Sequence, residues 1–262
     1  MRTAALLLAA AIAASASTRV LVTVIDPKSG LAVTNLTAAD FTAIDAGAPR
    51  PIEDVEFGSE PIDVLLLLDS SLLGQAVQAT AADLIQQLHE KEQMALVTFD
   101  SSASLVQDFT SSKNTLLARL SDVKYGNDPH ALDGLYASID GGFGNAVFRK
   151  VVLLLTAGFE GSSRVKDQTV IRLARKKGIA VYPLYLSGRE RGMFEKVARE
   201  TGGAAMHMRN FEKAKEKPAA RVFEIMRGRY VITLSGNLNV TEKFRVEVNR
   251  PGKLKVSTLP ID

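Results

Sequence analysis

Three short polar segments follow apolar stretches of this sequence, and their side chains are the ones best suited to chemistry. They are Asp69-Ser70-Ser71, Asp100-Ser101-Ser102 and Thr156-Ala157-Gly158. In an open parallel sheet, ligands bind beyond the carboxyl ends of the strands. Carboxylate and hydroxyl oxygens held at that edge are the ligands that Mg²⁺ and Mn²⁺ prefer. The segments therefore predict a cation site or a binding surface at one edge of a sheet.

Enzyme chemistry has few suitable residues in this chain. There is no cysteine, and the three histidines are His89, His130 and His207. No Gly-x-Ser-x-Gly nucleophile elbow occurs, and no histidine follows a strand in the manner of a catalytic base. Gly141-Gly142-Phe143-Gly144 follows a predicted helix and lacks the lysine of a phosphate loop, so it is interpreted as a helix end. We expect no catalytic residues, and an unrecognised hydrolase is the remaining enzyme alternative.

Buried strands must position these polar segments. Residues 64–68 and 151–155 are continuous apolar runs, typical of strands covered on both faces. Residues 94–99 and 179–186 predict further strands, and residues 104–109 a hairpin strand. Apolar residues at helical spacing predict helices near residues 77–88, 116–123, 132–139, 170–174 and 194–201. This alternation predicts an α/β fold with a Rossmann-like, doubly wound and mainly parallel sheet.

Both ends of the chain have a different pattern. Residues 20–25 predict a β-strand, and residues 45–51, with Gly47, Pro49 and Pro51, predict a loop. Near the other end, short strands are predicted at residues 230–234, 244–248 and 254–257. We expect the two ends to pair as a small β appendage. The boundaries are then an N-terminal β segment at 17–60, the α/β core at 61–217 and a C-terminal β segment at 218–262, with the charged stretch 212–217 beside the second boundary.

The first sixteen residues have the pattern of a secretory signal. Arg2 precedes an apolar run over residues 4–14, and Ala14-Ser15-Ala16 places small residues where signal peptidase cleaves. The run is too short to span a bilayer in the mature protein. We therefore predict a signal peptide at 1–16, a periplasmic or extracellular location and no membrane contact after cleavage.

The amino-acid composition limits the kinds of partner that the protein is expected to bind. Lys and Arg total 32 against 29 Asp and Glu, which gives a net charge of +3, and there is no tryptophan. Binding to a phosphate backbone requires a concentrated positive field, and this balance does not provide one. We expect no nucleic-acid partner.

The order of the polar motifs resembles a von Willebrand factor type A (VWFA) domain. The likeness rests on the strand ending in Asp69-Ser70-Ser71, on residues 96–99 and on the strand ending in Thr156-Ala157-Gly158. The flanks resemble those of secreted bacterial VWFA-related domain proteins, which are abundant in acidobacteria, at residues 22–30, 36–41, 228–232 and 244–248. The resemblance implies a Rossmann-like core with a metal-ion-dependent adhesion site at the top of its sheet. At such a site, a carboxylate from the partner completes the coordination of the cation.

Only part of that family site is kept. The first Asp and first Ser of the family pattern fall on Asp69 and Ser71, but the second Ser falls on Leu73 and the last Asp on Ala157. The family Thr falls near Pro129 and His130. The leading hypothesis is therefore a secreted, non-catalytic protein-binding or adhesion module with a degenerate adhesion site.

The alternative hypothesis is a divalent-cation-dependent adhesion module that uses Asp69 and Ser71. Asp128, Asp133 or His130 are conceivable substitute ligands in that case, and any Mg or Mn ion should be weakly bound. No other cofactor is expected. In either case a protein partner should bind at the carboxyl ends of the strands, over residues 69–74, 100–102, 126–130 and 157–164, which we call the strand-end surface. The residues of this surface that are predicted to contact the partner are Ser70, Leu72, Leu73, Asp100, Asp128, His130, Ala157, Phe159 and Glu160.

Overall fold

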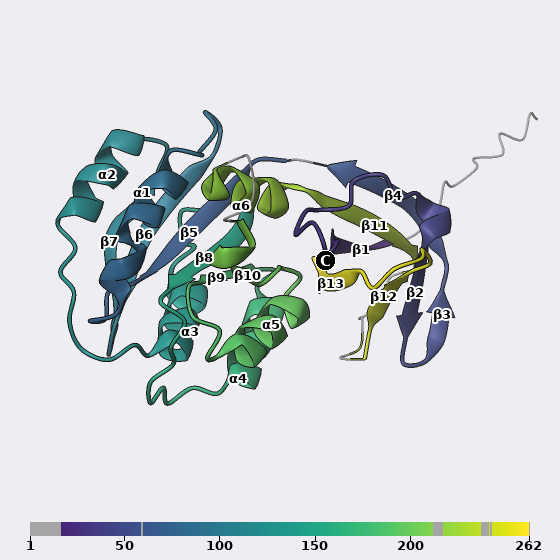
Figure 1. Ribbon diagram of the computed structural model, residues 1–262. Coiled ribbons are helices and arrows are strands. Elements are labelled where there is room, and N and C mark those ends of the chain that lie inside the picture. Colours follow the sequence, from purple (N-terminus) through teal and green to yellow (C-terminus); the bar gives the residue numbers. More distant parts are fainter. Residues whose placement is uncertain (1–16, 59, 212–216, 237–240, 242, 262) are drawn as a thin grey trace, which may run out of the picture.

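The centre of the molecule is a six-stranded sheet in the order β10-β9-β8-β5-β6-β7. The computed structural model describes residues 17–58, 60–211, 217–236, 241 and 243–261 (Figure 1). The strands of this sheet are β5 (Ile62–Asp69), β6 (Gln93–Phe99), β7 (Ala103–Thr110), β8 (Arg149–Thr156), β9 (Ala180–Tyr185) and β10 (Met206–His207). All neighbours are parallel except the β6–β7 hairpin.

Helices cover both faces of this sheet. The α-helices are α1 (Gln78–Ile85), α2 (Lys113–Ser121), α3 (Ala131–Gly141), α4 (Asp167–Lys176), α5 (Arg191–Glu200) and α6 (Pro218–Arg227), with short 3-10 turns η1 (Ala38–Asp40), η2 (Gly74–Val77) and η3 (Met208–Phe211). Leu66 and Leu68 of β5 share a core with α1, α2 and α6. Leu65 and Leu67 face the opposite core, with α3, α4 and α5. The doubly wound α/β fold predicted from the sequence is thus confirmed.

The two ends of the chain build two small antiparallel sheets beside this core. One has the order β13-β1-β11-β4 and the other β12-β2-β3. Their strands are β1 (Ser17–Ile25), β2 (Phe41–Asp45), β3 (Ala48–Arg50), β4 (Ile52–Gly58), β11 (Arg229–Ser235), β12 (Arg245–Val248) and β13 (Lys255–Pro260). A separate apolar core joins the sheets, with Val22 and Ile232 from one and Phe41 and Val246 from the other. The predicted β appendage from both termini is confirmed as part of the fold.

Two features of the N-terminal segment differ from the sequence prediction. Residues 45–51 were expected to be a loop, but residues 48–50 form β3, which pairs with β2. Pro49 is tolerated because β3 lies at the edge of its sheet. Strand β4 was not predicted, and it pairs with β11 over Ile52–Gly58. The predicted signal at 1–16 and most of the charged stretch at 212–217 lie outside the described residues.

The terminal sheets are tied to the α/β core at α5 and at the turn that follows it. The hydroxyl of Thr23 donates to the carbonyl of Gly202 at 2.9 Å, and the hydroxyl of Ser257 donates to the carbonyl of Gly203 at 2.6 Å. Lys255 of β13 pairs with Glu195 of α5 at 3.0 Å. Within the described part of the chain, no helix is long and apolar enough to cross a membrane.

Candidate functional site

Asp69 ends β5 at the strand-end surface and is fully buried. One carboxylate oxygen, Oδ2, accepts hydrogen bonds from the Thr156 hydroxyl at 2.8 Å and from the Ala157 backbone N–H at 3.0 Å. The other, Oδ1, accepts one from the Ser71 N–H at 3.0 Å. These donors come from the ends of β5 and β8, which are adjacent in the sheet. Asp69 therefore holds the two strand ends together.

Two hydroxyls near this carboxylate have no hydrogen-bond partner among the described residues. They are Ser71 Oγ and the phenolic oxygen of Tyr125, and both atoms are buried. Burial, with a further contribution from the negative charge of Asp69, raises the pKa of the Tyr125 hydroxyl to about 12. A buried hydroxyl without a partner costs free energy, so each marks a place where an oxygen-seeking ligand or an ordered water would be favourable.

The loop after β5 folds back tightly and exposes two leucines. Gly74 lies so close to Asp69 that a Cβ there would meet the Asp69 carbonyl oxygen at 2.1 Å, so only glycine fits. The turn closes with a hydrogen bond of 2.9 Å from the Gly74 N–H to the Ser71 carbonyl. Between these residues, Leu72 is 71% exposed and Leu73 is 50% exposed. The turn thus presents an apolar pair at the strand-end surface.

The loop between α2 and α3 packs directly on this turn. The Gly126 N–H donates to the Ser70 carbonyl at 2.9 Å, and the Leu72 N–H donates to the Asn127 carbonyl at 3.3 Å. The Asn127 amide also donates to the Asp100 carboxylate at 3.0 Å. Because these bonds link the ends of β5 and β6 to the loop, the exposed leucines stand on a rigid support.

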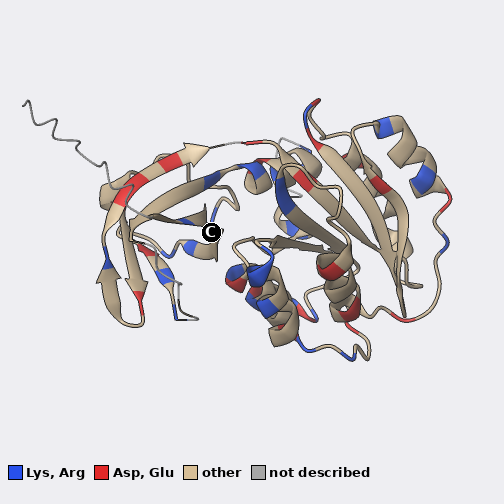
Figure 2. Cartoon of the chain, turned by 180° about the vertical axis from the view of Figure 1, so that it is seen from behind, with Lys and Arg blue, Asp and Glu red and all other residues tan. Residues whose placement is uncertain are grey.

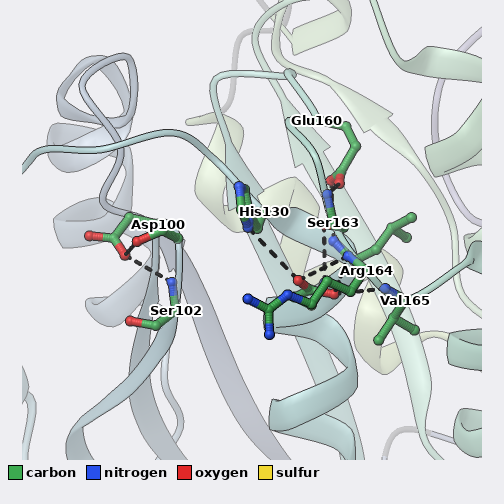
Figure 3. A network of polar contacts seen from close by, with 10 residues as sticks. Asp100, Ser102, His130, Glu160, Ser163, Arg164 and Val165 are labelled. Carbon is green, nitrogen blue, oxygen red and sulfur yellow. Dashed lines mark hydrogen bonds and ion pairs between the residues drawn. The ribbon is translucent and has the colours of Figure 1, made fainter.

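The start of α3 and the β8–α4 loop cap each other (Figure 3). The Glu160 carboxylate accepts hydrogen bonds from the N–H groups of Leu132 at 3.2 Å and Ser163 at 3.3 Å. In return, the Asp133 carboxylate accepts from the N–H groups of Arg164 and Val165 at 3.0 and 2.9 Å. Burial raises the pKa of Glu160, although these hydrogen bonds oppose the rise. Both carboxylates therefore serve to fix loops.

The predicted partner-contacting residues differ widely in exposure. Leu72, Leu73 and Asp128 are exposed, and Ser70 and Ala157 are buried. The half-buried members are Asp100, His130, Phe159 and Glu160. Figure 3 shows His130 turned toward the α3 start, with Nδ1 lying 3.8 Å from Asp133 Oδ2. The Arg189 guanidinium lies 5.9 Å from the centre of the Phe159 ring.

Of two further residues of the site, Thr156 belongs to a segment that the sequence singled out, and Tyr125 was not singled out. The Thr156 hydroxyl binds Asp69 directly, and Tyr125 lies close enough for the Asp69 charge to raise its pKa. Thr156 stands at a predicted strand end, which is why its segment was placed at the site, although its bond to Asp69 was not predicted. Tyr125 lies in a loop without a periodic pattern, and nothing local in the sequence connects it with Asp69.

The side chains of the site fit a divalent cation poorly. Leu73 and Ala157 offer no side-chain oxygen, and both oxygens of Asp69 already accept hydrogen bonds. Among the described residues, no group of three or more His, Cys, Asp or Glu side chains is arranged to hold a metal ion. One carboxylate and two hydroxyls would leave most of the shell of a Mg²⁺ ion to water.

The open sheet, with helices on both faces and polar residues at its strand ends, places the protein among the doubly wound α/β domains. A comparison with family models identifies the family. The model of the von Willebrand factor type A domain matches residues 63–219. The chain belongs to this family. A comparison with curated proteins found no match.

Solved structures with the same fold come from distant proteins. Proximal thread matrix protein 1 from the mussel byssus is 17% identical, with a TM-score of 0.54 over 68% of this chain and 49% of that one. A structure of the same mussel protein with a zinc-occupied MIDAS motif is 18% identical, with a TM-score of 0.57 over 71% and 50%. The chain thus spans about half the length of the mussel protein.

A bacterial structure matches over almost its whole length. The conserved hypothetical protein BatB from Bacteroides thetaiotaomicron is 14% identical, with a TM-score of 0.50 over 63% of this chain and 98% of that one. At these identities the likeness concerns the fold alone.

Proposed function

We propose that this protein is a secreted, non-catalytic binding module that captures a protein partner on the strand-end surface without a firmly held cation. Membership of the VWFA family supports the general role, because such domains are usually non-catalytic interaction modules. The absence of a cysteine nucleophile and of a serine elbow supports the non-catalytic part.

The exposed pair Leu72 and Leu73 carries the proposal. At 71% and 50% exposed, they are two of the most exposed large apolar residues in the described chain, and they are adjacent. Apolar side chains on a rigid support make good interface anchors, since little conformational freedom is lost on binding. Phe159 and Asp128 lie on the same surface and would extend the contact.

The substitutions at the family positions support binding without a metal. Leu73 stands where the family has a serine ligand and Ala157 where it has an aspartate. A partner whose carboxylate completes the coordination of a cation can bind only when that cation is present. An apolar contact at Leu73 requires no cation. We therefore propose that the adhesion site is degenerate.

Substitution of the leucine pair tests this function. The double variant Leu72→Asp/Leu73→Asp should capture at least tenfold less partner than the wild type. To measure this, the purified chain is mixed with the secreted fraction of the producing cells, and the proteins that become cross-linked to it are quantified. The matched control is Leu105→Asp, at an exposed leucine of β7 that is 62% exposed. Capture that is equal for the double variant and the wild type, at equal melting temperature, would rule the surface out.

The unpartnered hydroxyls of Ser71 and Tyr125 favour a second candidate, a cation-dependent adhesion module built on Asp69. In that case millimolar Mg²⁺ or Mn²⁺ should raise the melting temperature of the wild type, and Asp69→Asn should remove the rise. Asp54→Asn, at an exposed position of β4 outside the strand-end surface, serves as the control. No rise for the wild type supports the cation-free proposal, and a rise that depends on Asp69 contradicts it.

Export is the remaining part of the proposal. It rests on the signal-like pattern of residues 1–16 and on the resemblance of the flanks to secreted bacterial VWFA-related proteins. Mass spectrometry of the protein from its native cells should find a mature chain that begins at Ser17 in the periplasmic or extracellular fraction. A chain that still begins at Met1 and remains in the cytoplasm would contradict it.

A further inference from the structure

A cleft of about 780 Å³ lies between α5 and the C-terminal strands, away from the strand-end surface. Its walls come from α5, from β10 and from the segments around β12 and β13. Figure 1 shows α5 beside β13 at the junction of the core with the terminal sheets. None of its lining residues belongs to the strand-end surface.

The free edges of three sheets meet at this cleft. Strand β10 is an end strand of the six-stranded sheet, β13 of the four-stranded sheet and β12 of the three-stranded sheet. Each has a paired neighbour on one side only among the described residues. Edge strands present unpaired N–H and C=O groups, and these are a template for a further strand.

The lining residues show that the cleft runs along strand edges. Residues 254–257 and 246–248 all line it, without interruption. Successive side chains of a strand point to opposite faces of its sheet. A cavity over one face would therefore touch alternate residues, whereas a cavity along the edge touches them all.

The charge of the cleft selects its occupant. Four cationic side chains line it, Arg191 and Arg199 from α5 with Lys253 and Lys255 from the segment leading into β13. Two carboxylates also line it: Glu195 pairs with both Arg191 and Lys255, and Glu247 pairs with Arg245. Arg199 lies 3.4 Å from Glu200, which is outside the lining. Figure 2 shows charged residues banded along α5. Lys253 is exposed and has no ion pair among the described residues.

We propose that the cleft binds an acidic, extended segment of a partner protein, which adds as a strand to the edge of β13 or β12. Backbone hydrogen bonds supply affinity in this mode, and alternate side chains supply specificity. Acidic side chains would meet Arg191, Arg199 and Lys253, and apolar ones would meet Val256 and Phe211. A segment of about five residues matches the length of an ordinary strand.

A labelled peptide tests both parts of the proposal. The probe is a ten-residue fluorescein-labelled peptide of alternating Glu and Val, titrated with the full chain in low salt and followed by fluorescence anisotropy. We expect saturable binding that Arg199→Glu/Lys253→Glu weakens at least tenfold. The control variant Arg119→Glu, on an exposed face of α2, should bind like the wild type. Leu72→Asp/Leu73→Asp should also bind normally, because the cleft is separate from the strand-end surface.

Two further peptides separate strand addition from charge alone. A peptide with Lys in place of Glu should not bind. A Glu–Val peptide with alternate amides N-methylated keeps its charge but cannot pair along a strand, so its affinity should fall at least tenfold. Equal affinity of the methylated peptide, or its displacement by millimolar citrate, would assign the cleft to small anions and overturn the proposal. Absence of saturable binding, or normal binding by the charge-reversed variant at equal melting temperature, would overturn it as well.

Discussion

At the scale of single residues, Asp69 has a structural role as a buried hydrogen-bond acceptor. The alternative hypothesis from the sequence makes Asp69 a cation ligand, and in the structure it is the buried acceptor that joins the ends of β5 and β8. A carboxylate with three internal donors is stabilised without a metal. The two buried hydroxyls beside it, on Ser71 and Tyr125, are the part of the site that remains unpaired in the described chain.

Tyr125→Phe tests whether that hydroxyl truly lacks a partner. Removing a buried, unpartnered hydroxyl while keeping the ring should raise the free energy of unfolding by about 1 kcal/mol, since its desolvation cost disappears. Urea unfolding in the absence of divalent cations measures it. A loss of stability would show that the hydroxyl is bonded, to water or to an ion.

At the scale of elements, reciprocal capping links α3 to the β8–α4 loop. Substitution of Asp133 tests this link. Asp133→Ala removes the acceptor for the N–H groups of Arg164 and Val165. These two amides should then exchange with solvent at least tenfold faster, because local opening no longer breaks hydrogen bonds. Amides of Leu66 and Leu153 in the central strands should be unaffected, and unchanged exchange at 164 and 165 would contradict the capping role.

The end of α6 is held by an ion pair that gives a pH dependence. The Arg227 guanidinium donates to both oxygens of Glu92, which is 2% exposed. Burial alone would raise the pKa of the Glu92 carboxyl, but Arg227 and the His89 N–H outweigh burial and hold that pKa below its usual value of 4.5. A lowered folded-state pKa means that the stabilisation is present above the unfolded value and is lost as pH falls through the folded one.

Glu92→Gln should therefore lower the free energy of unfolding by about 2 kcal/mol at pH 7, since it removes the charge that Arg227 needs. The difference from the wild type should shrink as pH falls below 4.5. Urea unfolding at several pH values measures both effects. A difference that stays constant with pH would exclude the ion pair as its source.

How far the sequence predicted the elements depends on burial. Strands β5 and β8 are apolar throughout because both faces are covered, so their identity was evident. Strand β4 was missed because Glu53, Asp54 and Glu56 take three of the seven positions of an edge strand and leave no alternating pattern. The site was predictable at strand ends such as Asp69. Tyr125 was not, because only the tertiary packing of its loop brings it there.

At the scale of the whole molecule, Gly202 allows the core and the terminal sheets to approach closely. A Cβ on Gly202, which has φ of +79°, would lie 2.5 Å from the Cβ of Leu259 in β13. A Cβ on Gly203 would lie 2.0 Å from the carbonyl oxygen of Val181. The join to β13 therefore requires a glycine at 202, whereas Gly203 lets the turn after α5 pack on β9 within the core.

Gly202→Ala should lower the free energy of unfolding by about 2–3 kcal/mol, through both the left-handed backbone and the collision with Leu259. Gly192→Ala is the matched control, because it lies in the first turn of α5 with open space around it. That change should be neutral or slightly stabilising. Chemical unfolding of the two variants decides the matter, and equal stability would show that the join tolerates a side chain.

The position of β1 in the middle of its sheet has a consequence for the order of folding. Val20 pairs with Ile232 on one side and with Pro260 on the other, so the first described strand has both neighbours near the other end of the chain. Contacts between residues so distant in sequence form slowly, because a large loop must close first. We expect the α/β core, whose parallel strands are closer in sequence, to form early in folding. The terminal sheets then close last, so the cleft beside α5 is completed only in the final step.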